Sequence, residues 1–101
     1  MGVPVRFSAD YDRSMDVLYL FLGEPQPVEG DGLPGGIELD YSLQSGALCG
    51  ITVIGYARNL WNEKFSELVA IVSDRLEIDP FKASQEIERA VISQSVVHPH
   101  V

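Results

Sequence analysis

The chain has 101 residues, 46% of them hydrophobic and 22% charged, which indicates one globular domain and excludes a disordered or fibrous protein. Fifteen acidic residues against seven basic ones give a net charge of −8, which disfavours contact with the phosphates of nucleic acid. No apolar run reaches the roughly 20 residues that a membrane span needs. We therefore expect a soluble, cytoplasmic protein that binds neither nucleic acid nor membrane.

The first part of the chain, residues 1–56, has the patterns of β-strands. Apolar and polar residues alternate over residues 3–8, which predicts a short first strand. Residues 10–16 are rich in Asp and Ser, whose side chains bond their own backbone, and predict a turn. Residues 17–22 predict a second strand that is apolar on both faces.

A long loop and two further strands complete this β part. Residues 23–35 contain three prolines and four glycines, a composition typical of an exposed loop. Residues 37–41 alternate as a half-buried strand does, and Gly46 suits the turn that follows. Residues 47–56 are rich in β-branched side chains and predict the fourth strand.

In residues 57–95, the apolar residues recur with the spacing of a helix. One apolar stripe is formed by Phe65, Leu68, Val69, Val72 and Leu76, with Asn62 as the predicted N-cap. Asp79 followed by Pro80 predicts the start of a second helix. Its apolar side contains Ala83, Ile87, Ala90 and Val91. Residues 96–101 are interpreted as a frayed tail.

These elements predict an α+β fold, a four-stranded antiparallel β-sheet meander with two C-terminal helices, in a single domain of residues 1–101. Strands 17–22 and 48–54 are apolar on both faces, so both faces need cover. Two helices cover one face, and the chain has no third layer for the other. The sequence therefore predicts a homodimer, in which a second copy covers that face.

Two sequence motifs resemble ligand sites but lack the surroundings that these sites need. Gly30, Gly32 and Gly35 match G-x-G-x-x-G, yet prolines precede them and a strand follows, so no dinucleotide cofactor is expected. The acidic turn imitates the start of a calcium loop, but Met15 and Phe21 stand where Gly and Glu are required.

The candidate site residues are therefore few. Asp10, Asp12 and Asp16 are interpreted as turn residues, with a weaker cation site as the alternative. Trp61, at the junction between strand and helix, is a candidate interface residue. Cys49 is interpreted as a small buried hydrophobe, because no His or Lys is near it in sequence.

No catalytic residues, metal ligands or cofactors are predicted. His98 and His100 lie in the tail, which does not provide a rigid frame for a catalytic metal or a general base. Glu38 and Asp40 lie two residues apart on one strand face, a pattern that is also typical of a solvated face.

The segment from Tyr11 to Leu20 resembles the family of small bacterial and archaeal proteins known as domain of unknown function 2283. The pattern Y-D-x-x-x-D-x-L-Y is matched at Tyr11, Asp12, Asp16, Leu18 and Tyr19. The later segments 36–41 and 46–53 extend the resemblance to about half of the chain. Ser42 and Thr52 depart from it, standing where Asp and Glu are usual. The resemblance implies a small β-rich domain without an established activity, in some members an antitoxin-like partner protein.

The sequence thus favours a non-enzymatic protein-interaction domain, homo-oligomeric and able to bind a basic second protein in the manner of an antitoxin. The alternative is an enzyme or binding protein that depends on a divalent cation held by Asp10, Asp12 and Asp16.

Overall fold

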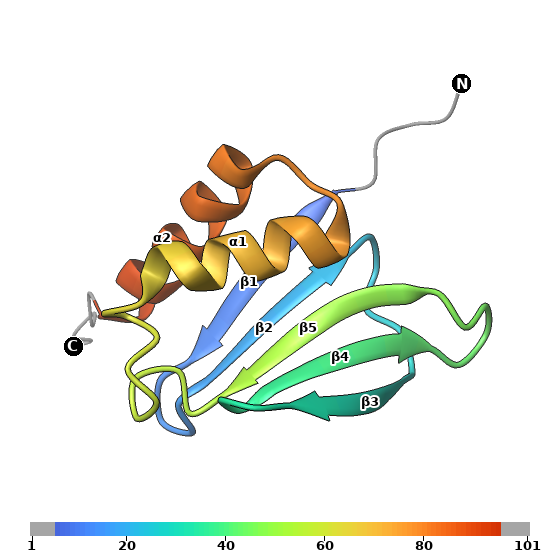
Figure 1. Ribbon diagram of the computed structural model, residues 1–101, viewed down its shortest axis with the longest axis horizontal. Helices are drawn as coiled ribbons and strands as arrows, with labels where there is room; N and C mark the ends of the chain where they lie inside the picture. The colour runs from blue at the N-terminus through green and yellow to red at the C-terminus, as the bar shows by residue number, and fades with distance from the viewer. Residues whose placement is uncertain (1–5, 96–101) are drawn as a thin grey trace, which may run out of the picture.

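Five antiparallel strands form one sheet, and two helices pack against one of its faces (Figure 1). The computed structural model describes residues 6–95. The elements in chain order are β1 (Phe7–Asp12), β2 (Val17–Leu22), β3 (Val28–Leu33), β4 (Ile37–Ser42), β5 (Leu48–Ile54), α1 (Phe65–Leu76) and α2 (Pro80–Ser95). The predicted α+β class, antiparallel sheet and two C-terminal helices are confirmed. The predicted tail, with His98 and His100, lies outside the described residues.

The sheet is not the predicted four-stranded meander. Its order is β1-β2-β5-β4-β3, so β2 pairs with β5, and a fifth strand, β3, forms one edge. The prediction of a loop over residues 23–35 is wrong, because Val28–Leu33 forms β3. Pro25, Pro27 and Pro34 all lie outside this strand. β3 pairs only with β4, and edge strands tolerate glycine because few of their side chains pack.

β1 and β2 form a hairpin whose first strand lies later in the chain than predicted. β1 covers Phe7–Asp12, so Asp10 and Asp12 belong to the strand rather than to the turn. The register pairs Asp12 with Val17, which leaves residues 13–16 for the turn. Residues 3–5, predicted as the start of the strand, lie outside the described residues.

The two helices bury the predicted apolar stripes. Leu68, Val69, Val72 and Leu76 of α1 are buried, as are Ala83, Ile87 and Ala90 of α2. The Oδ2 atom of Asp79 accepts the Lys82 N–H at 3.0 Å, which confirms the predicted start of α2. The predicted Asn62 cap is wrong. Lys64 occupies the N-cap of α1 without a side-chain bond, because hydrogen-bonded turns continue through residues 55–64.

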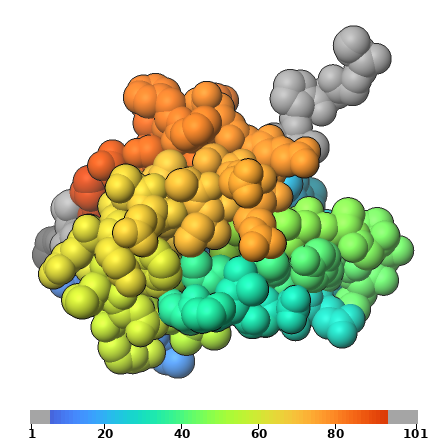
Figure 2. Space-filling model, viewed as in Figure 1, coloured from blue at the N-terminus to red at the C-terminus, as the bar shows by residue number. Residues whose placement is uncertain are grey.

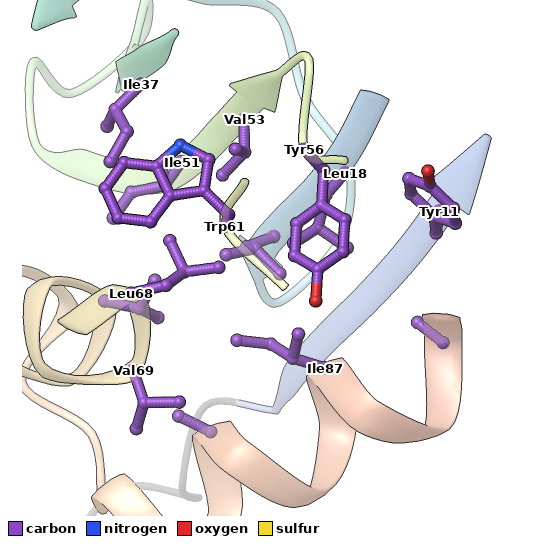
Figure 3. Packing of buried hydrophobic residues seen from close by; sticks show 14 of the residues in the cluster. Tyr11, Leu18, Ile37, Ile51, Val53, Tyr56, Trp61, Leu68, Val69 and Ile87 are labelled. Carbon is purple, nitrogen blue, oxygen red and sulfur yellow. The ribbon is translucent and has the colours of Figure 1, made fainter. Parts of the chain in front are cut away.

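The core lies between one face of the sheet and the helices. Tyr56 and Trp61, from the segment between β5 and α1, lie between the sheet residue Ile51 and the helix residues Leu68 and Ile87 (Figure 3). In the space-filling view, the helical residues in yellow to orange form a continuous layer (Figure 2). The teal residues of β3, an edge strand of the sheet, lie below this layer. The helices therefore cover one face, and the chain described by residues 6–95 adds no third layer.

The other face of the sheet, here called the open face, consists of every second residue of the strands. Leu18, Leu20, Ile51 and Val53 point to the core and are no more than 1% exposed. The residues between them point the other way. By register, the open face comprises Ser8, Asp10, Asp12, Val17, Tyr19, Phe21, Val28, Gly30, Gly32, Glu38, Asp40, Ser42, Gly50, Thr52 and Ile54.

Candidate functional site

Asp12 stabilises the turn of the β1–β2 hairpin. Its Oδ1 atom accepts the Ser14 hydroxyl at 2.8 Å and the Met15 N–H at 3.1 Å. These hydrogen bonds, that of Ser14 first, hold the pKa of the Asp12 carboxyl below its ordinary value. Asp10 is exposed on the open face, opposite Tyr19 on β2.

Asp16 joins the hairpin to the segment that follows β5. Its carboxylate accepts the Tyr11 hydroxyl at 2.7 Å and the N–H groups of Ala57 and Arg58 at 2.8 and 3.0 Å. Its main-chain carbonyl accepts two further N–H groups, from Gly55 and Tyr56. Asp16 has a φ of 59°, in the left-handed region that Asp tolerates better than most residues.

The pKa values of this pair fit a carboxylate that acts as an acceptor. Partial burial raises the pKa of Asp16, but the N–H groups of Ala57 and Arg58 and the Tyr11 hydroxyl outweigh it and hold the pKa below its ordinary value. Burial, and then the bond to Asp16, raise the pKa of Tyr11 to about 12. Asp16 is therefore a structural clamp.

The three acidic residues Asp10, Asp12 and Asp16 do not form a cation site in the described part of the chain. Asp12 and Asp16 direct their oxygens at different hydrogen-bond donors, and Asp10 lies on the strand before them. Within residues 6–95, no three His, Cys, Asp or Glu side chains gather closely enough to hold a metal ion. The geometry thus gives the cation alternative no support.

Trp61, the predicted interface candidate, lies in the interior. Its side chain is 5% exposed, and its indole N–H donates to the Gly35 carbonyl at 2.8 Å. The Lys64 ammonium lies 4.3 Å from the ring centre, which adds a cation–π contact. Trp61 fastens the β3–β4 turn to the helical segment and offers little surface to a partner.

A pocket of about 230 Å³ opens on the open face instead. Its walls come from β2, β4, β5, the segment between β2 and β3, and Val28 at the start of β3. The residues that give it its chemistry are Tyr19, Phe21, Asp40, Cys49, Gly50 and Thr52. The pocket combines aromatic walls with two carboxyl groups, those of the buried Asp40 and the exposed Glu24, and the sequence did not predict it.

The hollow exists because Gly50 has no side chain. By register, Gly50 is opposite Phe21 on β2 and opposite Asp40 on β4. A Cβ atom on Gly50 would lie 2.7 Å from the Leu20 carbonyl oxygen, closer than real contacts allow. The β2 and β4 side chains therefore stand on both sides of a gap in the middle of the sheet.

Asp40 lies in this gap and is only 8% exposed. Its Oδ2 atom accepts the Thr52 hydroxyl at 2.7 Å. Burial raises the pKa of the Asp40 carboxyl, and the bond from Thr52 offsets this in part. The expectation of a solvated face at Glu38 and Asp40 is thus wrong for Asp40.

Cys49 lines the pocket and is half-buried, so it is less enclosed than the sequence suggested. The register passes from Asp40↔Gly50 to Tyr41↔Leu48, which leaves Cys49 as the extra residue of a β-bulge. Burial, and then the charge of Asp40, raise the pKa of its thiol. The thiol therefore stays protonated near neutral pH and is a poor nucleophile.

Ser42 fixes the wall that the β2–β3 segment contributes. Its hydroxyl donates to Gln26 Oε1 at 2.6 Å and accepts the N–H groups of Gln44 and Ser45. Ser42 and Thr52 both support the pocket, Thr52 through Asp40 and Ser42 through Gln26.

No helix in the part of the chain that the structure describes is long and apolar enough to cross a membrane. Comparison of the chain with protein-family models, curated proteins and solved structures finds no match.

Proposed function

We propose that the protein is a non-enzymatic interaction domain that binds a basic partner protein through the open face of its sheet. The observation that carries the proposal is the combination of apolar and acidic side chains on a face that no described element covers. Tyr19, Val28 and Ile54 are 42%, 40% and 45% exposed there. Exposed apolar side chains that gather on one face are typical of binding surfaces.

The charge of the sheet favours a basic partner. None of the five strands contains a Lys or Arg, whereas the open face contains Asp10, Asp12, Glu38 and Asp40. A surface of one sign attracts a partner of the opposite sign and speeds their encounter. The resemblance to domain of unknown function 2283 supports the same kind of role, an antitoxin-like protein that neutralises a basic partner.

The pocket chemistry supports binding rather than catalysis. Its buried carboxyl group, that of Asp40, and its thiol, that of Cys49, both have pKa values shifted toward the neutral form. A protonated thiol lacks the nucleophilicity that covalent catalysis requires.

A second copy of the chain is the competing occupant of the open face. The homodimer expected from the sequence stays a prediction, and the exposed Tyr19 and Ile54 favour it. Two copies, however, would bring the acidic residues of both open faces together. Binding of a basic partner weakens with added salt, whereas pairing of two acidic copies strengthens, so the two occupants are distinguishable.

The test is capture from the basic protein fraction of the source cell, with matched variants. Ile54→Ser alters the open face, and Ile92→Ser alters a similarly exposed isoleucine on α2. We expect a basic protein to be retained by the wild type and by Ile92→Ser, and to be lost with Ile54→Ser. Equal retention by all three, or retention of no protein, would contradict the proposal.

A further inference from the structure

We infer that the pocket on the open face is a socket for one basic side chain of the partner, with the Asp40 carboxylate as its counter-ion. The inference rests on the proposed function and specifies its chemistry. The ligand is a single Arg or Lys side chain, which presents a cationic head on an aliphatic stem.

The size of the pocket fits one side chain. Its volume of about 230 Å³ is below the range of roughly 300 to 1,000 Å³ that is typical of small-molecule sites. Tyr19, Phe21 and Val28 line it with apolar surface, against which the methylene stem of Arg or Lys packs well. The two aromatic rings also attract a cation.

The Asp40 carboxylate is incompletely satisfied by the chain itself. Its Oδ2 atom accepts the Thr52 hydroxyl, and no other hydrogen bond within the described residues reaches the carboxylate. No described side-chain oxygen is both fully enclosed and without a partner, so the Oδ1 atom keeps some exposure, and Asp40 is one of the residues that line the pocket. A residue that is only 8% exposed thus keeps one acceptor oxygen that can bind a donor entering the pocket.

The charge of Asp40 also lacks a partner. Arg89 and Glu86 form a salt bridge on α2, which lies on the helix side of the sheet and does not involve Asp40. Burial without a counter-ion disfavours the charged carboxylate. A guanidinium or ammonium group from outside supplies the missing charge, and a guanidinium also reaches Oδ1 with a directed N–H.

The pocket is preformed by bonds that do not involve the ligand. The bond from Ser42 to Gln26 holds the outer wall, and the bond from Thr52 fixes the carboxylate orientation. Preorganisation of this kind lowers the entropy lost on binding.

The test uses side-chain analogues, because the partner is unidentified. The ¹⁵N-labelled full chain is titrated with n-butylguanidinium and with the neutral n-butylurea, and the amide signals of Gly50 and Thr52 are followed by NMR. We expect saturable shifts with n-butylguanidinium and none with n-butylurea.

Variants assign the binding to Asp40. In Asp40→Asn the dissociation constant should rise about tenfold or more, because a charged hydrogen bond is lost. Asn retains an oxygen for the Thr52 hydroxyl, so this variant should fold. Cys49→Met keeps the carboxylate but fills the pocket, and should also lose binding. Glu67→Gln is the control, because Glu67 is exposed in the first turn of α1, on the helix side of the sheet and outside the pocket.

Equal binding of n-butylurea, unchanged binding in Asp40→Asn, or the absence of saturation would each overturn the socket. The capture experiment keeps the two proposals separate. If Ile54→Ser loses the basic partner while n-butylguanidinium does not bind, the socket is wrong and the proposed function stands. If Ile54→Ser retains every protein that the wild type retains, the proposed function fails even where n-butylguanidinium binds.

Discussion

Asp40 is a residue whose charge opposes folding. Its pKa in the folded chain lies above the ordinary value of 3.8 because the side chain is buried. The folded state therefore holds its proton more tightly than the unfolded state, so its contribution to stability is fully present below 3.8 and is lost as the pH rises through the folded pKa. A protein that retains such a group at neutral pH keeps it at a cost in stability.

We expect Asp40→Asn to raise the free energy of unfolding at pH 7, by on the order of 1 kcal/mol. The gain should shrink below pH 4, where the wild-type carboxyl is protonated as well. Denaturant unfolding of both proteins across this range measures the difference. A variant that is less stable than the wild type at pH 7 would contradict the view that burial dominates.

Asp16 behaves in the opposite way. Its folded pKa lies below 3.8, so its contribution to stability is present above 3.8 and is lost as the pH falls through the folded value. Asp16→Ala removes the acceptor for the Tyr11 hydroxyl and for two backbone N–H groups. We expect a loss of about 2 kcal/mol, with allowance for the partial solvent exposure of the site.

Asp12→Ala is the matched comparison for Asp16→Ala. It removes hydrogen bonds that lie within the turn alone, so its melting temperature should lie between those of Asp16→Ala and the wild type. Thermal unfolding of the three proteins at pH 7 decides the order. If the two variants have the same melting temperature, the link from Asp16 to Ala57 and Arg58 adds nothing to stability.

At the level of elements, the sequence predicts the strands and helices that have a regular spacing of apolar residues or a typical local composition. Strand 17–22 and the apolar stripe of α1 follow from spacing alone, and both match the structure. β3 could not be found in this way, because the three prolines around it dominate the composition of its segment. Its pairing with β4 is a property of the sheet and leaves no periodic signal in an exposed, glycine-containing edge strand.

The pocket shows the same limit. Asp40 is a polar position in a strand that alternates apolar and polar residues. This pattern alone favours a solvated side chain. Its burial depends on Gly50 and Phe21, which register brings beside it from elsewhere in the chain. The sequence does contain the glycine, but the register that places it between Phe21 and Asp40 requires the strand order.

The edge strand β3 gives a prediction about stability. As a free loop, residues 26–32 could be replaced by a short Gly-Ser turn with a change of about 1 kcal/mol, because loop-closure entropy varies slowly with length. As a paired strand, they carry most of the ladder with β4 and the Gln26 tether of Ser42. We therefore expect a loss of about 3 kcal/mol on deletion, measured by denaturant unfolding. A change near 1 kcal/mol would show that the pairing contributes little.

For the whole molecule, charge governs self-association. The net charge of −8 opposes the homodimer that the apolar part of the open face favours. In about 0.01 M salt the repulsion acts over roughly 30 Å, and in about 1 M salt over roughly 3 Å. We expect light scattering to give a mass near 11.1 kDa at low salt, and a mass that rises toward twice this value at high salt. A dimer that dissociates as salt is added would contradict this account.

The pairing of β2 with β5 has a consequence for the order of folding. The β1–β2 hairpin and the β3–β4–β5 unit each join strands that are neighbours in sequence, whereas β2–β5 pairs join positions as distant as Val17 and Ile54. Pairing between such distant positions carries a large loop-closure entropy and tends to form late. The pocket spans this junction, with Tyr19 and Phe21 on one side and Gly50 and Thr52 on the other. A partner that inserts a side chain there therefore recognises only chains in which β2 and β5 are paired, and its binding holds the two halves of the sheet together.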